Sequence, residues 1–141
     1  LENPYTDELL PLPIIEIRPT QSKWFDFEAK YNLGGAEEIC PAPIPQHLFS
    51  QCQEIGLKAH LILGCRGMSR TEIIIDDQEI CWVIETNTIP GFTETSLLPQ
   101  AAAAAGIPYA GVVDFLIEEA LRRRTPSADD VSNAPRTKNP S

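Results

Sequence analysis

Residues 66–97 read RGMSRTEIIIDDQEICWVIETNTIPGFTETSL, and this stretch decides the fold. Two short runs rich in β-branched and apolar residues, 70–75 and 80–87, predict two strands. The polar residues Asp76 to Glu79 separate the runs and predict a tight turn. Pro90 and Gly91 then end the second strand. The stretch therefore predicts an antiparallel hairpin that is followed by a glycine-bearing loop.

Charged and amide side chains fall at alternate positions of both predicted strands. Side chains alternate between the faces of a strand, so Arg70 and Glu72 share one face of the first strand. Val83, Glu85 and Asn87 share one face of the second, and an even number of loop residues places all five on the same sheet face. Carboxylate and amide oxygens with room for water suit Mg²⁺, usually together with substrate phosphates. The alternative interpretation is a solvated hairpin face, where charged residues normally lie.

Length and composition narrow the classes of function. The chain has 141 residues, of which 43% are hydrophobic and 22% charged, which is ordinary for one globular domain or part of a larger one. A formal net charge of −9 argues against nucleic acid as a partner, because phosphate binding needs clustered Lys and Arg. No apolar run approaches the roughly 18 residues of a membrane span, so no membrane association is expected. The first residue is Leu1 rather than Met, and we expect upstream sequence to be missing.

The cysteines and histidines do not form a metal-binding motif. The four cysteines are scattered without CxxC pairing, and we expect small buried hydrophobic side chains in a cytosolic protein at positions Cys40, Cys52, Cys65 and Cys81. His47 and His60 lie off the apolar stripe of the helix that is predicted below from Pro45 to Gly64. We therefore expect both histidines to be exposed to solvent.

The remaining elements follow from local patterns. A helix is predicted from Pro45 to a stop at Gly64, with an apolar stripe formed by Leu48, Cys52, Ile55, Ala59 and Ile62. The other expected elements are a loop at 1–10, strands within 12–18 and 36–42, and helices at 97–105 and 108–124.

Two segments are expected to lack regular structure. Residues 19–35 show no period and carry several aromatic side chains around Lys30. This segment is either a loop fixed to the core by its aromatic residues or a lid that brings Lys30 to an anionic ligand. Residues 125–141 are rich in Pro, Ser, Asn and Asp and are expected to form a disordered tail.

Four sequence blocks carry a resemblance to a known family. At FDFEAKY, GCRGMSRTE, VIETNTIPGFTETSL and PQAAAAAGI, the chain resembles D-alanine–D-alanine ligases of the ATP-grasp superfamily. The blocks occur in the family's order and span roughly Pro11 to Arg124. The resemblance implies an α+β fold in which residues 1–124 form the C-terminal part of an ATP-grasp ligase domain, an antiparallel sheet with packed helices.

The resemblance also implies a reaction and its partners. ATP phosphorylates the carboxylate of one D-alanine, and the amine of a second D-alanine attacks the acyl phosphate to give D-alanyl-D-alanine for peptidoglycan precursors. The implied enzyme is bacterial and cytoplasmic, depends on Mg²⁺ or Mn²⁺, and is a homodimer in its full-length form. The family's N-terminal part is missing, so we expect the chain to be inactive alone.

The resemblance assigns roles to residues of the predicted hairpin and of the loop after it. Glu72, Glu85 and Asn87 match the family's metal ligands. Arg70 and the backbone N–H of Gly91 match the donors that stabilise the oxyanion of the tetrahedral intermediate. The family usually has Asp where this chain has Glu72, and the added methylene affects a metal that tolerates geometry poorly.

Further roles fall on the next helix and on the segment 19–35. Ser96 and the backbone of Leu97 match the clamp on the carboxylate of the second substrate. Lys30 matches a lysine that reaches the ATP phosphates, and Tyr31 matches a tyrosine that closes its loop over the site. The residues that match apolar contacts of the adenine ring are Trp24 and Ile84.

Two alternatives remain open from the sequence. The chain can be a separate nucleotide-binding subunit of a split enzyme, acting with a partner chain. It can also belong to another carboxylate–amine ligase of the superfamily, because the missing part holds further specificity residues.

Overall fold

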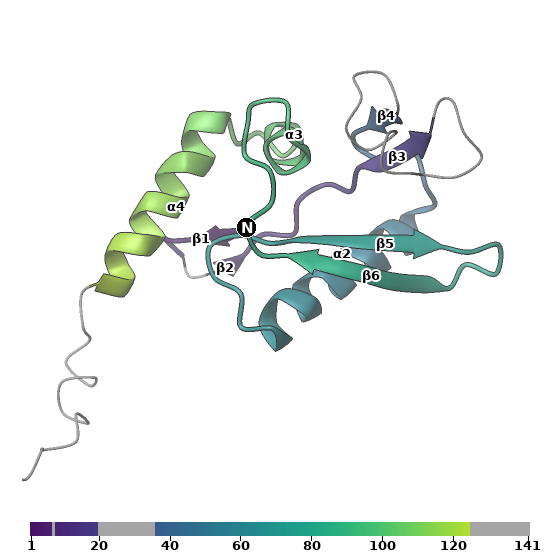
Figure 1. Cartoon of the computed structure of the whole chain (residues 1–141), viewed down its shortest axis with the longest axis horizontal. Helices are drawn as coiled ribbons and strands as arrows, with labels where there is room; N and C mark the ends of the chain where they lie inside the picture. Colours follow the sequence, from purple (N-terminus) through teal and green to yellow (C-terminus); the bar gives the residue numbers. More distant parts are fainter. Residues whose placement is uncertain (7, 20–35, 125–141) are drawn as a thin grey trace, which may run out of the picture.

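The computed structural model describes residues 1–6, 8–19 and 36–124. Three antiparallel strand pairs and three helices form this part of the chain, an α+β arrangement as the sequence predicts (Figure 1). Our expectations for the loop 20–35, including its lid interpretation, and for the tail 125–141 fall outside it. In chain order the elements are β1 (Glu2–Asn3), β2 (Glu8–Leu9), β3 (Glu16–Pro19), β4 (Ala36–Ile39), α2 (Gln46–Ile62), β5 (Arg70–Ile75), β6 (Cys81–Asn87), α3 (Leu97–Ala104) and α4 (Tyr109–Arg124).

The predicted hairpin is confirmed as β5 and β6, and its turn is built around Asp76. The amide of Glu79 donates to the carbonyl of Asp76, and the amide of Asp76 donates to the carbonyl of Ile80. Glu79 adopts a left-handed backbone with φ +61°, which is how a type I turn followed by a left-handed residue closes a hairpin. The Asp76 carboxylate accepts the amides of Gln78 and Ile80 at 2.9 Å each and the indole N–H of Trp82 at 2.8 Å.

Helix α2 packs against both strands of the hairpin (Figure 1). Its buried side chains are Leu48, Cys52 and His60. Ile62 was expected on the apolar stripe, but it is 83% exposed because the last turn of α2 extends beyond the packed surface. His47 is exposed as expected, whereas the expectation for His60 is wrong, since its side chain is only 5% exposed.

A second cluster lies where α3 and α4 meet the first residues of the chain. Leu98, Ala102 and Val112 are buried together with Leu1, and the small Ala102 side chain lets the two helices approach closely. The N-terminus is held here by reciprocal bonds between Leu1 and Leu10 and by the amide of Glu2, which donates to Gly67 at 2.7 Å.

The first residues differ from the expected loop. Glu2–Asn3 and Glu8–Leu9 pair as the antiparallel strands β1 and β2. Strands of this length are too short to show an alternating pattern, so no local pattern predicts them. The strand predicted at 12–18 is confirmed only from Glu16, and it includes Pro19, which we expected to begin the following loop. The strand predicted at 36–42 ends at Ile39.

In the described part of the chain, no single helix has the length and apolar character needed to span a membrane. The pair Leu97–Ala104 and Tyr109–Arg123 meets that test by length and composition only when both helices are counted together, across a bend of 106°.

The loop before β5 predicts a contrast between two glycines. Gly64 (φ +63°) and Gly67 (φ +69°) share a left-handed backbone, which disfavours alanine by about 1–2 kcal/mol. A Cβ at Gly64 meets nothing within 4 Å, whereas one at Gly67 lies 3.0 Å from Cδ2 of Leu116. In chemical unfolding, Gly67→Ala should therefore lose about 1 kcal/mol or more beyond the loss of Gly64→Ala. Equal losses would show that α4 does not pack on this loop.

The turn predicts a dependence of stability on pH. The indole of Trp82 and the amides of Ile80 and Gln78 lower the pKa of Asp76 below its ordinary value of 3.8. A lowered pKa means that the ionised carboxylate stabilises the fold above pH 3.8 and that this contribution disappears as the pH falls through the folded value. The free energy of unfolding of the wild type should therefore exceed that of Asp76→Asn at neutral pH. This difference should disappear in acid. Asp77→Asn, in the same turn, is the matched control for removing one carboxylate from the hairpin.

Candidate active site

The pairing of β5 with β6 brings four predicted site residues together. Arg70 lies opposite Asn87, and Glu72 lies opposite Glu85. Residues directly opposite in an antiparallel pair have Cβ atoms roughly 4.5–5.5 Å apart on the same face of the sheet. The expectation that two carboxylates, an amide and a guanidinium converge on one patch is therefore confirmed by the register.

This register depends on a β-bulge in β6. The loop 77–79 holds an odd number of residues, which by itself puts Glu85 on the face opposite to Glu72. A register shift between Glu72 and Ile73 leaves Ile84 as an extra residue and restores the pairing of Glu72 with Glu85. Val83 pairs with Ile73 instead, so the expectation that Val83 shares the face of Glu85 is wrong. Ile84 itself is 57% exposed.

Arg70 is fixed on this patch and retains a donor. Its Nη2 donates to Oε1 of Glu72 at 2.6 Å, and the two side chains are 23% and 25% exposed. The Nε of Arg70 is buried and has no hydrogen-bond partner within the described ranges. An unpartnered buried donor costs about 1–3 kcal/mol, and such a cost is typical of a group that meets its partner only when a ligand binds.

Asn87 connects the patch to the glycine-bearing loop. Its side-chain oxygen accepts the amide of Ile89 at 3.2 Å, which forms an Asx turn and orients the carboxamide. The chain then passes through the fully buried Pro90 to Gly91. A Cβ on Gly91 would lie 3.3 Å from the hydroxyl oxygen of Ser96, so glycine leaves room for the Ser96 side chain beside this loop.

Ser96 occupies the N-cap position of α3 but does not cap it with its side chain. Its hydroxyl instead accepts the amide of Thr93 at 3.0 Å and lies 2.8 Å from the hydroxyl of Thr93. The first amides of α3, beginning with Leu97, therefore receive no side-chain cap from Ser96. Free amides at a helix N-terminus, together with the helix dipole, favour a carboxylate or phosphate.

A tyrosine that sequence reasoning missed holds the glycine-bearing loop. Tyr109, at the start of α4, donates its hydroxyl to the carbonyl of Phe92 at 3.2 Å, and the two rings lie 5.2 Å apart. The residue next to Gly91 is thereby anchored to a helix. No local pattern marks Tyr109, because its role depends on a contact with residues that precede it by a whole helix.

A second missed group positions the segment before Arg70. The buried His60 bridges two elements: its Nδ1 lies 2.8 Å from the hydroxyl of Ser69, and its Nε2 lies 3.3 Å from Glu2. Glu2 also accepts the amide of Gly67 at 2.8 Å. These bonds satisfy the imidazole on both nitrogens, which is why it can be buried, and they fix the loop that leads into β5.

The donor set fits a divalent cation that is shared with phosphates. No group of three or more His, Cys, Asp and Glu side chains gathers within the described residues. The patch offers the carboxylates of Glu72 and Glu85 and the amide oxygen of Asn87. Mg²⁺ is usually bound by one or two carboxylates plus substrate phosphates and waters, so a small oxygen-donor set of this kind suits it.

The predicted site residues fall into three groups. Arg70, Glu72, Glu85 and Asn87 share the hairpin face, and Gly91, Ser96 and Leu97 lie along the following loop and helix start. Ile84, the unpaired bulge residue before Glu85, belongs to neither of these two groups. The remaining predicted residues lie outside the described ranges, namely Trp24, Lys30 and Tyr31.

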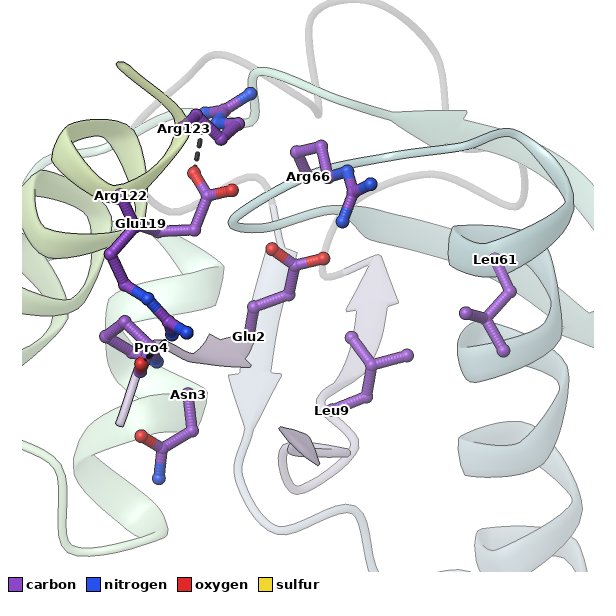
Figure 2. Close-up of a pocket in the computed structure, with 9 residues that line it drawn as sticks. All are labelled: Glu2, Asn3, Pro4, Leu9, Leu61, Arg66, Glu119, Arg122 and Arg123. Carbon is purple, nitrogen blue, oxygen red and sulfur yellow. Dashed lines mark hydrogen bonds and ion pairs between the residues drawn. The ribbon is translucent and has the colours of Figure 1, made fainter. Parts of the chain in front are cut away.

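A cavity of about 500 Å³ lies elsewhere, between the N-terminal strands, α2 and the end of α4 (Figure 2). Glu119 and Arg123 form an ion pair of 2.6 Å on its wall, and Arg122 donates to the carbonyl of Pro4. Arg66 and Glu2 also line it. None of the predicted site residues lines this cavity, so it is not the candidate active site.

Comparison with known proteins finds relatives of one kind. The family model described as the D-ala D-ala ligase C-terminus matches residues 6–118. The D-alanine–D-alanine ligase of Syntrophobacter fumaroxidans is 49% identical over 116 residues, which are 82% of this chain and 37% of that protein. The corresponding ligase of Leptospira biflexa is 49% identical over 123 residues, 86% of this chain and 35% of that protein.

Solved structures give the same assignment. A D-alanine–D-alanine ligase from Bacillus anthracis complexed with ATP superposes with a TM-score of 0.66 at 34% identity, covering 80% of this chain and 35% of that chain. The VanG D-Ala:D-Ser ligase from Enterococcus faecalis gives a TM-score of 0.61 at 31% identity, covering 79% and 32%. The chain thus spans about a third of the length of its relatives. Because a family model matches most of its length and relatives approach half identity, this chain belongs to the D-ala D-ala ligase C-terminus family.

Proposed function

We propose that this chain forms the C-terminal part of an ATP-dependent ligase that joins two D-alanine molecules into D-alanyl-D-alanine through an acyl phosphate, for peptidoglycan and cell-wall synthesis. The observation that carries the proposal is the β5–β6 register, which sets Arg70 opposite Asn87 and Glu72 opposite Glu85. In this proposal the longer ligase is a bacterial cytoplasmic homodimer.

The carboxylates of Glu72 and Glu85 and the amide of Asn87 hold Mg²⁺ or Mn²⁺ together with ATP phosphates. A divalent cation at this position neutralises charge during phosphoryl transfer. Glu72 has a second task, because its ion pair of 2.6 Å orients the Arg70 guanidinium. The longer Glu side chain in place of the usual Asp supports this dual role.

Arg70 and Gly91 stabilise the tetrahedral intermediate. When the amine attacks the acyl phosphate, the carbonyl oxygen becomes negative and needs donors that are already in position. The unpartnered Nε–H of Arg70 is one such donor. The backbone N–H of Gly91 is the other, and the absence of a side chain at this position lets substrate approach the backbone.

Ser96 and Leu97 bind the carboxylate of the second D-alanine at the start of α3. The Ser96 hydroxyl shares its hydrogen with Thr93 and can turn it towards a carboxylate, since either oxygen of this pair can be the donor. The amides of Leu97 and Leu98 in the first turn of α3, where Pro99 has no N–H, and the positive end of the helix dipole add to the attraction. Lys30, Tyr31, Trp24 and Ile84 complete the nucleotide side in this proposal.

A second candidate is a ligase of the same mechanism that takes D-serine as its second substrate. The similarity to the D-Ala:D-Ser ligase VanG favours it, although at a lower TM-score than the D-alanine–D-alanine ligase of Bacillus anthracis. Product analysis with D-alanine alone and with D-alanine plus D-serine separates the two. A mixed dipeptide formed in preference to D-alanyl-D-alanine would favour the second candidate.

The chain alone should not ligate D-alanine, because its relatives are about three times as long and this chain covers 37% of one of them. The measurement is phosphate release from ATP that depends on D-alanine. Release above that of a buffer control would show that the chain needs no further part and would overturn the proposed division of the enzyme.

The ligand role of Glu85 can be tested in a chimaera. The segment of the Syntrophobacter fumaroxidans ligase that aligns with this chain is replaced by residues 1–124, and D-alanine-dependent phosphate release is measured. Glu85→Gln should keep the fold but reduce turnover on the order of 100-fold or more, because a neutral amide replaces a charged ligand. The matched control Glu54→Gln, on the exposed face of α2, should stay within about twofold of the unmodified chimaera. Full turnover in Glu85→Gln would contradict the metal site.

The close approach of Gly91 to Ser96 predicts a specific loss in the same chimaera. A methyl group at 91 would lie 3.3 Å from the Ser96 hydroxyl, a contact tight enough to shift this hydroxyl by a few tenths of an ångström. Gly91→Ala should therefore raise the KM for the second D-alanine and lower kcat, by about 10-fold or more together. The control is Gly56→Ala in α2, where a Cβ meets nothing within 4 Å and activity should not change. Unchanged kinetics for Gly91→Ala would remove the loop from the site.

A further inference from the structure

Two of the four cysteines lie next to each other. The Sγ atoms of Cys52, on α2, and Cys81, at the start of β6, are 3.9 Å apart. Both are free thiols, as are Cys40 and Cys65. Cys52 is buried and Cys81 is half-buried. The pair therefore connects the helix beneath the hairpin to the hairpin itself, and one of its members is within reach of solvent.

The two sulfur atoms are in non-bonded contact. A disulfide has an S–S length of about 2.05 Å, so the sulfurs must approach by roughly 2 Å for a bond to form. Cys81 pairs with Ile75 at the turn end of the hairpin, far along the strands from the Glu72–Glu85 pair. A bond here does not require the candidate active site to rearrange.

We propose that Cys52 and Cys81 form an oxidation site, at which a hydroperoxide converts the two thiols into a disulfide that tethers α2 to β6. The proposal does not rest on the ligase reaction. The disulfide would link α2 covalently to β6, the strand that carries the proposed metal ligands Glu85 and Asn87.

The order of the two oxidation steps follows from the environments of the thiols. Burial, with Cys81 beside it, raises the pKa of Cys52 to about 11, so this thiol stays protonated near neutral pH. Cys81, being half-buried, is the thiol that a hydroperoxide reaches. The Cys81 sulfur attacks one oxygen of the peroxide, the O–O bond breaks, the alcohol leaves with the proton of the Cys81 thiol, and Cys81 becomes a sulfenic acid.

The second step closes the disulfide. The sulfur of Cys52 attacks the sulfur of the Cys81 sulfenic acid, the S–O bond breaks, and water leaves with the proton of Cys52. Two thiols have then been oxidised by two electrons in total, and one hydroperoxide has been reduced to an alcohol and water. A thiol reductant reverses the bond by exchange.

The alternative is a packing pair without redox chemistry, since free cysteines commonly serve as small hydrophobic side chains. Cys40 and Cys65 provide the internal comparison. Burial also raises the pKa of the Cys40 thiol, yet no sulfur contact with another cysteine accompanies it in the described residues. Oxidation confined to the adjacent pair would therefore reflect proximity rather than general thiol reactivity.

The test treats the folded wild-type chain with tert-butyl hydroperoxide and maps its peptides without reduction. We expect the intact mass to fall by two hydrogen atoms, one linked peptide that contains Cys52 and Cys81, and reversal by dithiothreitol. The oxidised chain should also unfold at a higher temperature than the reduced chain, because the bond closes a loop between distant residues. Neither measurement involves ligase activity, so their failure is distinguishable from failure of the proposed function.

Matched variants sharpen the result. Cys40→Ser with Cys65→Ser should form the same link, whereas Cys81→Ser should form none. The half-buried Cys81 is chosen because a serine at the buried Cys52 can impair folding. Links to Cys40 or Cys65, links between chains, or Cys81 oxidised to sulfinic acid without a link would each overturn the proposal.

Discussion

The cross-strand pairing of Glu72 with Glu85 is the constraint on which the candidate site depends. A shift of one residue moves every side chain of a strand to the opposite face. The turn at Asp76 and the extra residue Ile84 act together, because the turn alone would place Glu85 away from Glu72. A bulge that corrects a register next to functional residues is a built feature of a sheet rather than a defect.

The residues that support this pairing come from distant parts of the chain. His60 on α2 bonds Ser69 and Glu2 and so fixes the segment that enters β5. Tyr109 on α4 holds Phe92 and fixes the segment that leaves β6. Both strands of the hairpin are thus held at its open end, where Arg70 and Asn87 lie. At the other end, the Asp76 carboxylate accepts the hydrogen bonds of the turn. An isolated two-stranded hairpin is only marginally stable, so these anchors give the patch its fixed geometry.

The sequence was most informative where a pattern is local. The β-branched and apolar run RTEIII predicted β5 with correct bounds, and the apolar run before Gly106 predicted α3 to within one residue. The predicted face shared by Arg70, Glu72, Glu85 and Asn87 was also correct. It held only because loop and bulge residues together make an even number, whereas with this three-residue loop a regular strand would have placed Ile84 opposite Glu72 and Glu85 on the other face.

What the sequence could not predict depends on contacts between distant residues. The burial of His60 requires Glu2 and Ser69 as hydrogen-bond partners, and no helical period reports them. The pairs Cys52–Cys81 and Tyr109–Phe92 join residues that are far apart in the chain. The donors of the patch were recognisable from residue type and spacing, because metal chemistry limits the types and strand geometry limits the spacing.

The β5–β6 register can be measured directly on this chain by nuclear Overhauser contacts between backbone protons of the two strands. The account predicts cross-strand contacts for Arg70 with Asn87, Glu72 with Glu85 and Ile73 with Val83, with Ile84 unpaired. Contacts of Glu72 with Ile84 and of Arg70 with Thr86 would reveal a continuous ladder without a bulge. That result would place Glu85 and Asn87 on the opposite face and contradict the candidate site.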